Sequence, residues 1–216
     1  MTTRILYHDR DLLVCRKPAG MPSQPDASGQ PDLLTLLQGI HPTASLVHRL
    51  DTPTGGVMVF GLTPKATARL CAMVQDHEAF RKEYLAVLSH PLPEETGEMR
   101  DFLYHDKKLN KSFVTDGKRK GSKEAILSYR ALAADEQGHA LVSVRLYTGR
   151  THQIRVQFAS RGYPLVGDGK YGNREKCPYI GLWAHRLTLS HPITGKPISV
   201  ETFPDTNIYP WQLFDF

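Results

Sequence analysis

The stretch "LVHRLDTPTGGVMVF", residues 46–60, decides what kind of fold the chain can form. It ends in the apolar run of residues 57–62, and a Pro-Thr-Gly-Gly segment stands directly before that run. Short β-branched and aromatic runs that follow a Gly/Pro turn are typical of buried strands. The first half of the stretch places Arg49 and Asp51 two residues apart, immediately before the turn. A strand with a charged pair at its entrance is therefore the first prediction.

The same pattern of short apolar runs between turns recurs along the chain. Strands are predicted at residues 5–7, 12–15, 57–62, 84–88, 125–132, 141–147, 182–189 and 198–203. Helices are predicted at 64–79, about 151–160 and 33–37, the first with Thr63 as its cap and Pro64 in its first turn. Strands in clusters, without regular β-α-β alternation, predict an α+β fold with a mixed, mainly antiparallel sheet and flanking helices.

The length of 216 residues and the 40% hydrophobic content favour one globular domain covering residues 1–216. No apolar run approaches the roughly 18 residues of a membrane helix, and charged residues near the N-terminus interrupt any signal-peptide core, so a cytoplasmic protein is expected. Two segments, 20–31 and 106–122, are predicted to be long loops.

Cofactor and metal motifs are missing from the sequence. The three cysteines form no C-x-x-C pair, and the ten histidines form no tight ligand pattern, so neither a disulfide framework nor a metal site is expected. Phosphate-loop and dinucleotide-binding motifs are also missing, and "VGDGKYG" (166–172) is interpreted as a tight turn around Asp168. We expect no cofactor.

Positive charge is concentrated in one segment. The formal net charge is +5, but residues 107–123 alone hold seven cations against one acid. These are Lys107, Lys108, Lys111, Lys118, Arg119, Lys120 and Lys123, with Asp116 as the acid. Such a segment either binds nucleic-acid phosphates or is a solvated hairpin that its lysines keep soluble. Charge alone leaves both interpretations open.

The residues around Asp51 also allow two interpretations. Asp often serves in an Asx turn or a helix cap, but here it stands beside Arg49 and before two glycines and a predicted buried strand. Tyr84 begins a predicted strand, where aromatic residues are ordinary core material. The cluster of Arg150, His152, Gln153 and Arg155 offers enough hydrogen-bonding capacity to face an anion or a carboxylate.

Four motifs occur in order: "RKPAGMPSQP" (16–25), "HRLDTPTGG" (48–56), "RKEYLAV" (81–87) and "GRTHQIRV" (149–156). Together they resemble the RluA-type family of RNA pseudouridine synthases, over residues 12–203. The resemblance implies the pseudouridine synthase catalytic fold with a central active-site cleft, and an isomerase that converts uridine in RNA to pseudouridine. Many relatives carry an N-terminal S4 domain, and this sequence is expected to hold only the catalytic domain.

The resemblance also assigns roles to single residues. Asp51 corresponds to the catalytic aspartate, Tyr84 to the tyrosine that lies against the target base, and Arg155 to the arginine that pairs with the aspartate. Arg49 corresponds to the arginine near the flipped nucleotide. The implied partner is a stem-loop of ribosomal or transfer RNA, bound by a monomer whose RNA-binding residues are Lys107, Lys108, Lys111, Lys118, Arg119 and Lys120.

The chain departs from the family pattern at a few positions. Gly55 stands where the family usually has Ser, Gly61 where it commonly has Ala, and Gln157 and Tyr163 where it has His. These departures keep open an alternative, a catalytically inactive RNA-binding protein on the same scaffold. A third hypothesis is a hydrolase that uses His48 and Asp51 as an acid-base pair, although the motifs offer no second carboxylate for it.

Overall fold

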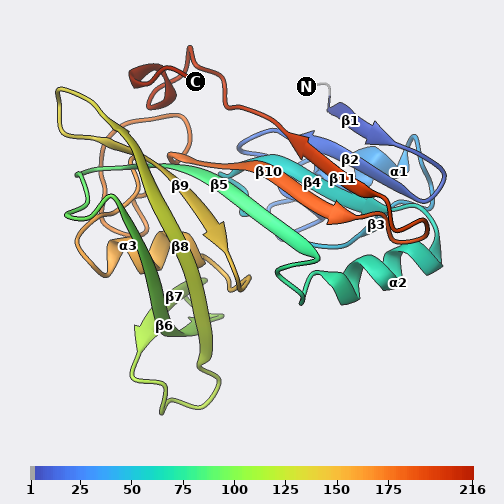
Figure 1. The fold of residues 1–216 in the computed structure, drawn as a ribbon, viewed down its shortest axis with the longest axis horizontal. Coiled ribbons are helices and arrows are strands. Elements are labelled where there is room, and N and C mark those ends of the chain that lie inside the picture. The colour runs from blue at the N-terminus through green and yellow to red at the C-terminus, as the bar shows by residue number, and fades with distance from the viewer. Residues whose placement is uncertain (1–2) are drawn as a thin grey trace. The chain divides into compact units, whose positions relative to one another are not determined.

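The computed structural model describes residues 3–216 (Figure 1). The chain forms two compact units. The first unit contains the residues up to Lys82 and Trp183–Pro204, and the second contains Glu83–Leu182 and Asp205–Phe216. Among residues 3–216, no helix is both long and apolar enough to cross a bilayer.

The first unit is built on strands from both ends of the chain. Its strands are β1 (Arg4–His8), β2 (Leu12–Lys17), β3 (Ser45–Leu46), β4 (Gly55–Gly61), β10 (Leu182–Ser190) and β11 (Pro197–Glu201). The order is β1-β2-β4-β10, with β3 paired to β4 and β11 paired to β10. The β4–β10 pair is parallel, whereas β1–β2, β2–β4 and β10–β11 are antiparallel. The mixed sheet predicted from the sequence is thus confirmed.

Two helices accompany this sheet, α1 (Leu33–Gln38) and α2 (Pro64–Met73). Helix α2 begins as predicted, because the Thr63 hydroxyl accepts the N–H of Ala66 at 3.3 Å. Its predicted end at residue 79 is wrong. The carboxylate of Asp76 accepts the N–H groups of Glu78 and Ala79, and this local turn replaces the helical hydrogen bonds.

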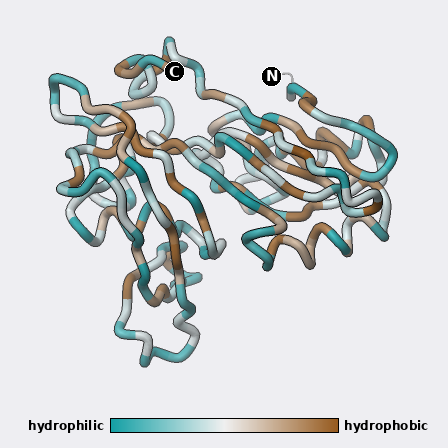
Figure 2. The backbone as a smooth tube through the Cα atoms, in the orientation of Figure 1, coloured by the Kyte–Doolittle hydropathy of each residue, from teal (hydrophilic) through white to brown (hydrophobic). Residues whose placement is uncertain are grey.

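The departure at Gly61 follows from the packing of α2. A Cβ added at Gly61 would lie 2.1 Å from Oγ1 of Thr67 and 2.7 Å from its Cα. Alanine therefore does not fit while α2 keeps this close approach to β4. Beneath the helix, apolar side chains from β2, β4 and β10 form one buried cluster that includes Val14, Val59 and Leu187. Figure 2 shows hydrophobic residues concentrated along the strands.

The second unit contains the remaining strands. They are β5 (Phe80–Leu88), which begins in the first unit, β6 (Thr96–Asp106), β7 (Lys111–Thr115), β8 (Lys123–Ala134) and β9 (Ala140–Leu146), in the order β5-β9-β8-β6-β7. The unit also holds helix α3 (Gln153–Ala159) and a 3-10 turn at Trp211–Leu213. Helix α3 packs on the sheet, with Val156 against Leu103 and Ala125.

The predicted loop 106–122 is wrong in its middle, although residues 107–110 form a turn and residues 116–122 a loop. Residues 111–115 form strand β7, which pairs with β6 in an antiparallel hairpin. The buried residue of this strand is the polar Ser112, whereas the apolar Val114 is exposed, so the strand lacks the apolar pattern that marks a buried face. Strand β6 was missed as well. The predicted loop at 20–31 is confirmed, since this segment holds no helix or strand.

Candidate active site

The turn that carries Asp51 is held by the first sequence motif. The carbonyl of Thr52 accepts the N–H of Gly20 at 2.8 Å, and the Ser23 hydroxyl donates to the carbonyl of Leu50 at 2.8 Å. The Ser23 hydroxyl also accepts the N–H of Leu50. The motif at 16–25, to which the sequence assigned no role, therefore fixes the backbone on both sides of Asp51.

Lys17 is the central element of this support, and sequence reasoning missed it. The side chain is fully buried, and its ammonium donates to three carbonyl oxygens: Pro18 at 3.0 Å, Met21 at 2.5 Å and Thr52 at 3.2 Å. Burial lowers the pKa of Lys17 to about 7, and the negative charge of Asp51 opposes this shift. A lysine at the end of an apolar strand, directly before a proline, was the available signal.

The glycines after Asp51 allow the turn to pack closely against β10. A Cβ at Gly55 would lie 2.2 Å from Cζ3 of Trp183, and a Cβ at Gly56 would lie 2.1 Å from the carbonyl oxygen of Ala184. Gly56 also has φ +124, a conformation that only glycine adopts readily. The departure at Gly55 thus has a steric cause, because Trp183 fills the space that a serine side chain would need.

Trp183 is itself firmly held. Its indole N–H donates to the carbonyl of Thr202 at 2.9 Å, and the guanidinium of Arg16 lies 4.8 Å from its ring centroid. The ring is almost fully buried. The 51–56 turn therefore packs on a side chain that has little freedom to move aside.

The charged residues of the turn differ in exposure. Arg49 is exposed. Asp51 is partly buried, so it is neither fully exposed to solvent nor fully shielded from it. His48 has a structural role, since its Nε2 accepts the N–H of Val59 and its ring packs edge-on against Phe80. Desolvation lowers the pKa of His48 to about 3. A neutral, bonded His48 argues against the hydrolase hypothesis.

In the second unit, Arg155 forms a buried ion pair that the sequence did not predict. Its Nε lies 2.6 Å from Oδ2 of Asp168 and its Nη2 lies 2.9 Å from Oδ1, with both side chains almost fully buried. The turn predicted at Asp168 is confirmed, since its carbonyl accepts the N–H groups of Tyr171 and Asn173. The carboxylate, however, binds Arg155, and this bidentate pair fixes the plane of the guanidinium.

The other polar residues of the "GRTHQIRV" motif mainly bind backbone groups. The Arg150 Nε donates to the carbonyl of Glu124, and the amide of Gln153 joins Arg150 N–H to the carbonyl of Ile126. His152, at φ +56, places its Nδ1 2.9 Å from the Tyr171 hydroxyl. Arg150 and Gln153 thus satisfy the strand-to-helix turn, whereas Arg155 is the member of the cluster that faces a carboxylate, that of Asp168.

Tyr84 is buried in β5, close to where this strand enters the second unit. Of the residues predicted for the site, Arg49 and Asp51 belong to the first unit, and Tyr84 and Arg155 to the second. Their roles stay predictions.

The cationic segment lies on the β6–β7 hairpin and the loop that follows. Lys107 and Lys108 lie in the turn between the two strands, and Lys118, Arg119 and Lys120 lie in the 116–122 loop, all of them exposed. The guanidinium of Arg119 lies 3.5 Å from the ring centroid of Tyr104. Lys111 is only partly exposed and lies within 5.1 Å of the Tyr171 ring centroid.

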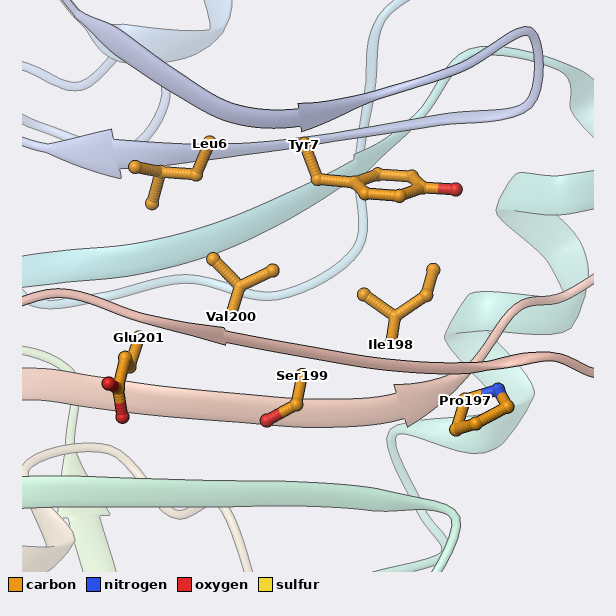
Figure 3. Close-up of a pocket in the computed structure, with 7 residues that line it drawn as sticks. All are labelled: Leu6, Tyr7, Pro197, Ile198, Ser199, Val200 and Glu201. Atoms are coloured by element: carbon orange, nitrogen blue, oxygen red, sulfur yellow. The ribbon is translucent and has the colours of Figure 1, made fainter.

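One cavity of about 430 Å³ lies between β1 and β11 in the first unit (Figure 3). Its lining is mostly apolar, with Leu6, Ile198 and Val200, and Glu201 at its edge pairs with Arg186. It contains none of the predicted site residues. Such a lining offers little to a nucleotide, which needs polar partners.

Among residues 3–216, Asp9, Asp11 and His191 form a group that could hold a metal ion. However, His191 Nδ1 accepts the N–H groups of Ile193 and Thr194, so its Nε2 carries the proton and donates to Asp9 at 2.8 Å. That proton leaves His191 without a nitrogen to offer a metal.

Comparison with known proteins identifies a matching family and several relatives. A family model described as RNA pseudouridylate synthase matches residues 11–160. The dual-specificity RNA pseudouridine synthase RluA of Yersinia pestis is 32% identical over 203 residues, covering 90% of this chain and 95% of the relative. The tRNA pseudouridine synthase C of Salmonella typhi is 30% identical, covering 91% and 84%. The ribosomal large subunit pseudouridine synthase D of Pseudomonas aeruginosa is 34% identical, covering 92% and 67%.

Among solved structures, human RNA pseudouridylate synthase domain containing 1 superposes with a TM-score of 0.79 at 23% identity, covering 97% of this chain and 86% of that one. This likeness confirms the pseudouridine synthase fold. The chain belongs to the RNA pseudouridylate synthase family, in its RluA-type branch. It is an isomerase that acts on uridine in RNA.

Proposed function

We propose that this chain isomerises uridine in a stem-loop of ribosomal or transfer RNA, with Asp51 as the group that attacks the target nucleotide. In this reaction the bond between C1′ and N1 breaks and a bond between C1′ and C5 forms. The proton on C5 is released, and N1 gains a proton. The bond that Asp51 forms on attack breaks again before the product leaves, so bonds and electrons balance without an oxidant or an energy source.

The observation that carries the proposal is the construction around Asp51. The backbone beside this carboxylate is held by the buried ammonium of Lys17 and by the Gly20 N–H. A nucleophilic carboxylate must be ionised, and nearby positive charge favours that form. A turn fixed in this way keeps the reactive oxygen in place, and correct placement supplies a large part of enzymatic rate enhancement.

We assign the other three residues to roles around Asp51 and the substrate. Arg155 is the cation that pairs with Asp51, Tyr84 stacks on the target base, and Arg49 contacts RNA beside the flipped nucleotide. Extracting a base costs a few kcal/mol, and stacking on an aromatic ring returns roughly 1 to 3 kcal/mol. Stem-loops are the natural substrate because their bases are the least costly to extract.

The exposed cations of the hairpin and its loop support the choice of a folded RNA. Lysine and arginine side chains there can bind the phosphates of the stem, which gives salt-dependent affinity with little sequence preference. We further propose that the protein acts as a monomer, without a metal ion, in the cytoplasm.

The test is tritium release from RNA transcripts that contain 5-tritiated uridine. Asp51→Asn should abolish release while filter binding of the same RNA stays within about threefold of wild type, because the substitution is nearly isosteric. The matched control is Asp76→Asn, which changes an exposed aspartate in the same unit. Turnover by Asp51→Asn would refute the assignment.

The same assay separates the alternative. An inactive RNA-binding protein would bind the transcripts in a salt-dependent way while the wild-type chain releases no tritium from any of them. Mapping pseudouridine in cellular RNA with and without the gene would then identify the modified uridine, since a site that disappears is the substrate.

A further inference from the structure

Tyr171 connects the arginine of the proposed site to the lysine-bearing strand. Its hydroxyl accepts the N–H of Ser112 in β7 at 2.8 Å and lies 2.9 Å from His152 Nδ1 at the start of α3. The Ser112 hydroxyl in turn donates to the carbonyl of Thr151 at 2.6 Å. One phenol therefore ties β7 to the turn that leads into α3, the helix that carries Arg155.

The ring of Tyr171 makes a second set of contacts. Its centroid lies 5.1 Å from the guanidinium carbon of Arg155 and 5.1 Å from the ammonium of Lys111. Both distances are within the range of cation–π attraction. The backbone N–H of Tyr171 donates to the carbonyl of Asp168, so the carboxylate and the ring that hold Arg155 come from one turn.

The electrostatics of the phenol agree with this geometry. Burial raises the pKa of Tyr171, while the Ser112 N–H and the charge of Arg155 oppose the rise. The phenol is thus neutral at physiological pH, with its face available to cations and its oxygen available to the Ser112 N–H. The bidentate pair with Asp168 fixes one edge of the guanidinium, and a contact with the ring restricts its remaining motion.

We propose that Tyr171 is a positioning residue for the isomerisation, whose ring holds Arg155 in place and whose hydroxyl joins strand β7 and its lysine to the turn that leads into α3. This inference depends on the proposed function, because it gives Tyr171 a role through Arg155. It assigns Tyr171 no contact with RNA. The ring should act on turnover, whereas the hydroxyl should act on RNA binding through β7.

The experiment compares two substitutions with a matched tyrosine. Tyr171→Leu removes both the ring and the hydroxyl, so it should lower kcat about tenfold, the loss expected from one half-buried cation–π contact, and raise KM as Tyr171→Phe does. Tyr171→Phe keeps the ring and should keep kcat within about threefold while KM rises. The control is Tyr209→Leu, since Tyr209 lies in the same unit and hydrogen-bonds Glu175 instead; its kcat should match wild type.

A double-mutant cycle in urea unfolding tests the contact without any turnover. Tyr171→Leu should destabilise the wild type more than it destabilises Arg155→Lys, whose flexible ammonium still faces Asp168 but cannot stack as a plane. Additive energies, or an active wild type whose Tyr171→Leu variant keeps its kcat, would overturn the role of Tyr171. A wild-type chain without turnover would instead refute the proposed function, so the two failures are distinguishable.

Discussion

Gly55→Ser should lower both the stability and the turnover of the protein, and a second substitution at Trp183 should restore part of both. A Cβ at position 55 would lie 2.2 Å from Cζ3 and 2.8 Å from Cε3 of Trp183, and 3.0 Å from the backbone N of Ala19. Carbon atoms do not approach this closely, so the indole must move. Overpacking a dense core costs about 1 to 3 kcal/mol. Losing the indole hydrogen bond to Thr202 adds about 1 kcal/mol.

We therefore expect Gly55→Ser to lower the free energy of unfolding by about 2 to 4 kcal/mol, measured by urea denaturation. Turnover should fall further than stability explains. Asp51 lies four residues before the clash, and a displacement of its carboxylate by about 1 Å can cost roughly a hundredfold in rate. Tritium release under conditions where the variant is folded measures this loss.

The double variant Gly55→Ser/Trp183→Leu should recover part of both losses, since the smaller side chain leaves room for the serine. Gly39→Ser is the matched control. Gly39 lies at the end of α1 with a negative φ, and a Cβ there would meet its nearest atom at 3.4 Å. If Gly55→Ser is as stable and active as wild type, or the double variant is no better than Gly55→Ser, the steric explanation is wrong.

Three further predictions concern charge. Lys17 has a pKa of about 7 when folded and 10.5 otherwise, so the unfolded chain binds more protons between these values and stability should rise with pH there. Between pH 7 and 9.5, the free energy of unfolding measured in urea should rise more for the wild type than for Lys17→Met, by at most about 1.4 kcal/mol per pH unit. The same pH dependence in both proteins would contradict this prediction. Asp168→Asn should cost about 3 to 5 kcal/mol, because it removes the bidentate carboxylate partner of the buried Arg155 guanidinium, whereas Asp101→Asn, in a more exposed pair, should cost under about 1 kcal/mol. Equal losses in urea would refute that difference. Replacing the three cations of the 116–122 loop by alanine should reduce the salt dependence of RNA affinity by a slope of about 2 to 3 in filter binding; an unchanged slope would exclude phosphate binding there.

The elements predicted well from the sequence are those whose structure is determined by their own side chains and immediate neighbours. Strand β4 follows a turn and is apolar throughout, and helix α2 begins with a cap and a proline. Strand β7 could not be recognised in this way. Its inward residue is Ser112, which is satisfied by Thr151 and Tyr171, residues about forty and sixty positions away in the chain. Only the tertiary structure makes a polar residue suitable for that position.

The same difference holds for the site: some of its features are indicated by neighbouring residues in the sequence, and others depend on tertiary contacts. Asp51 and Arg155 were proposed as site residues because ordered motifs surround them. The pairing of Arg155 with Asp168 was not predicted, because a carboxylate between two glycines has the same local pattern whether it only makes a turn or also binds a cation. The steric requirement at Gly55 comes from Trp183, which is brought beside it by the parallel pairing of β4 and β10.

In each unit, one buried charged residue supports one part of the proposed reaction. In the first unit, Lys17 is buried to hold the backbone beside Asp51, and in the second, Arg155 is buried against Asp168. Burying a charge is costly, and apolar residues of similar volume often stabilise a fold as well or better. Stability alone therefore does not explain either choice. In the proposed reaction, which uses no cofactor, one carboxylate and one cation must be placed accurately, and the bonds to the backbone beside Asp51 and to the Arg155 guanidinium would serve that placement.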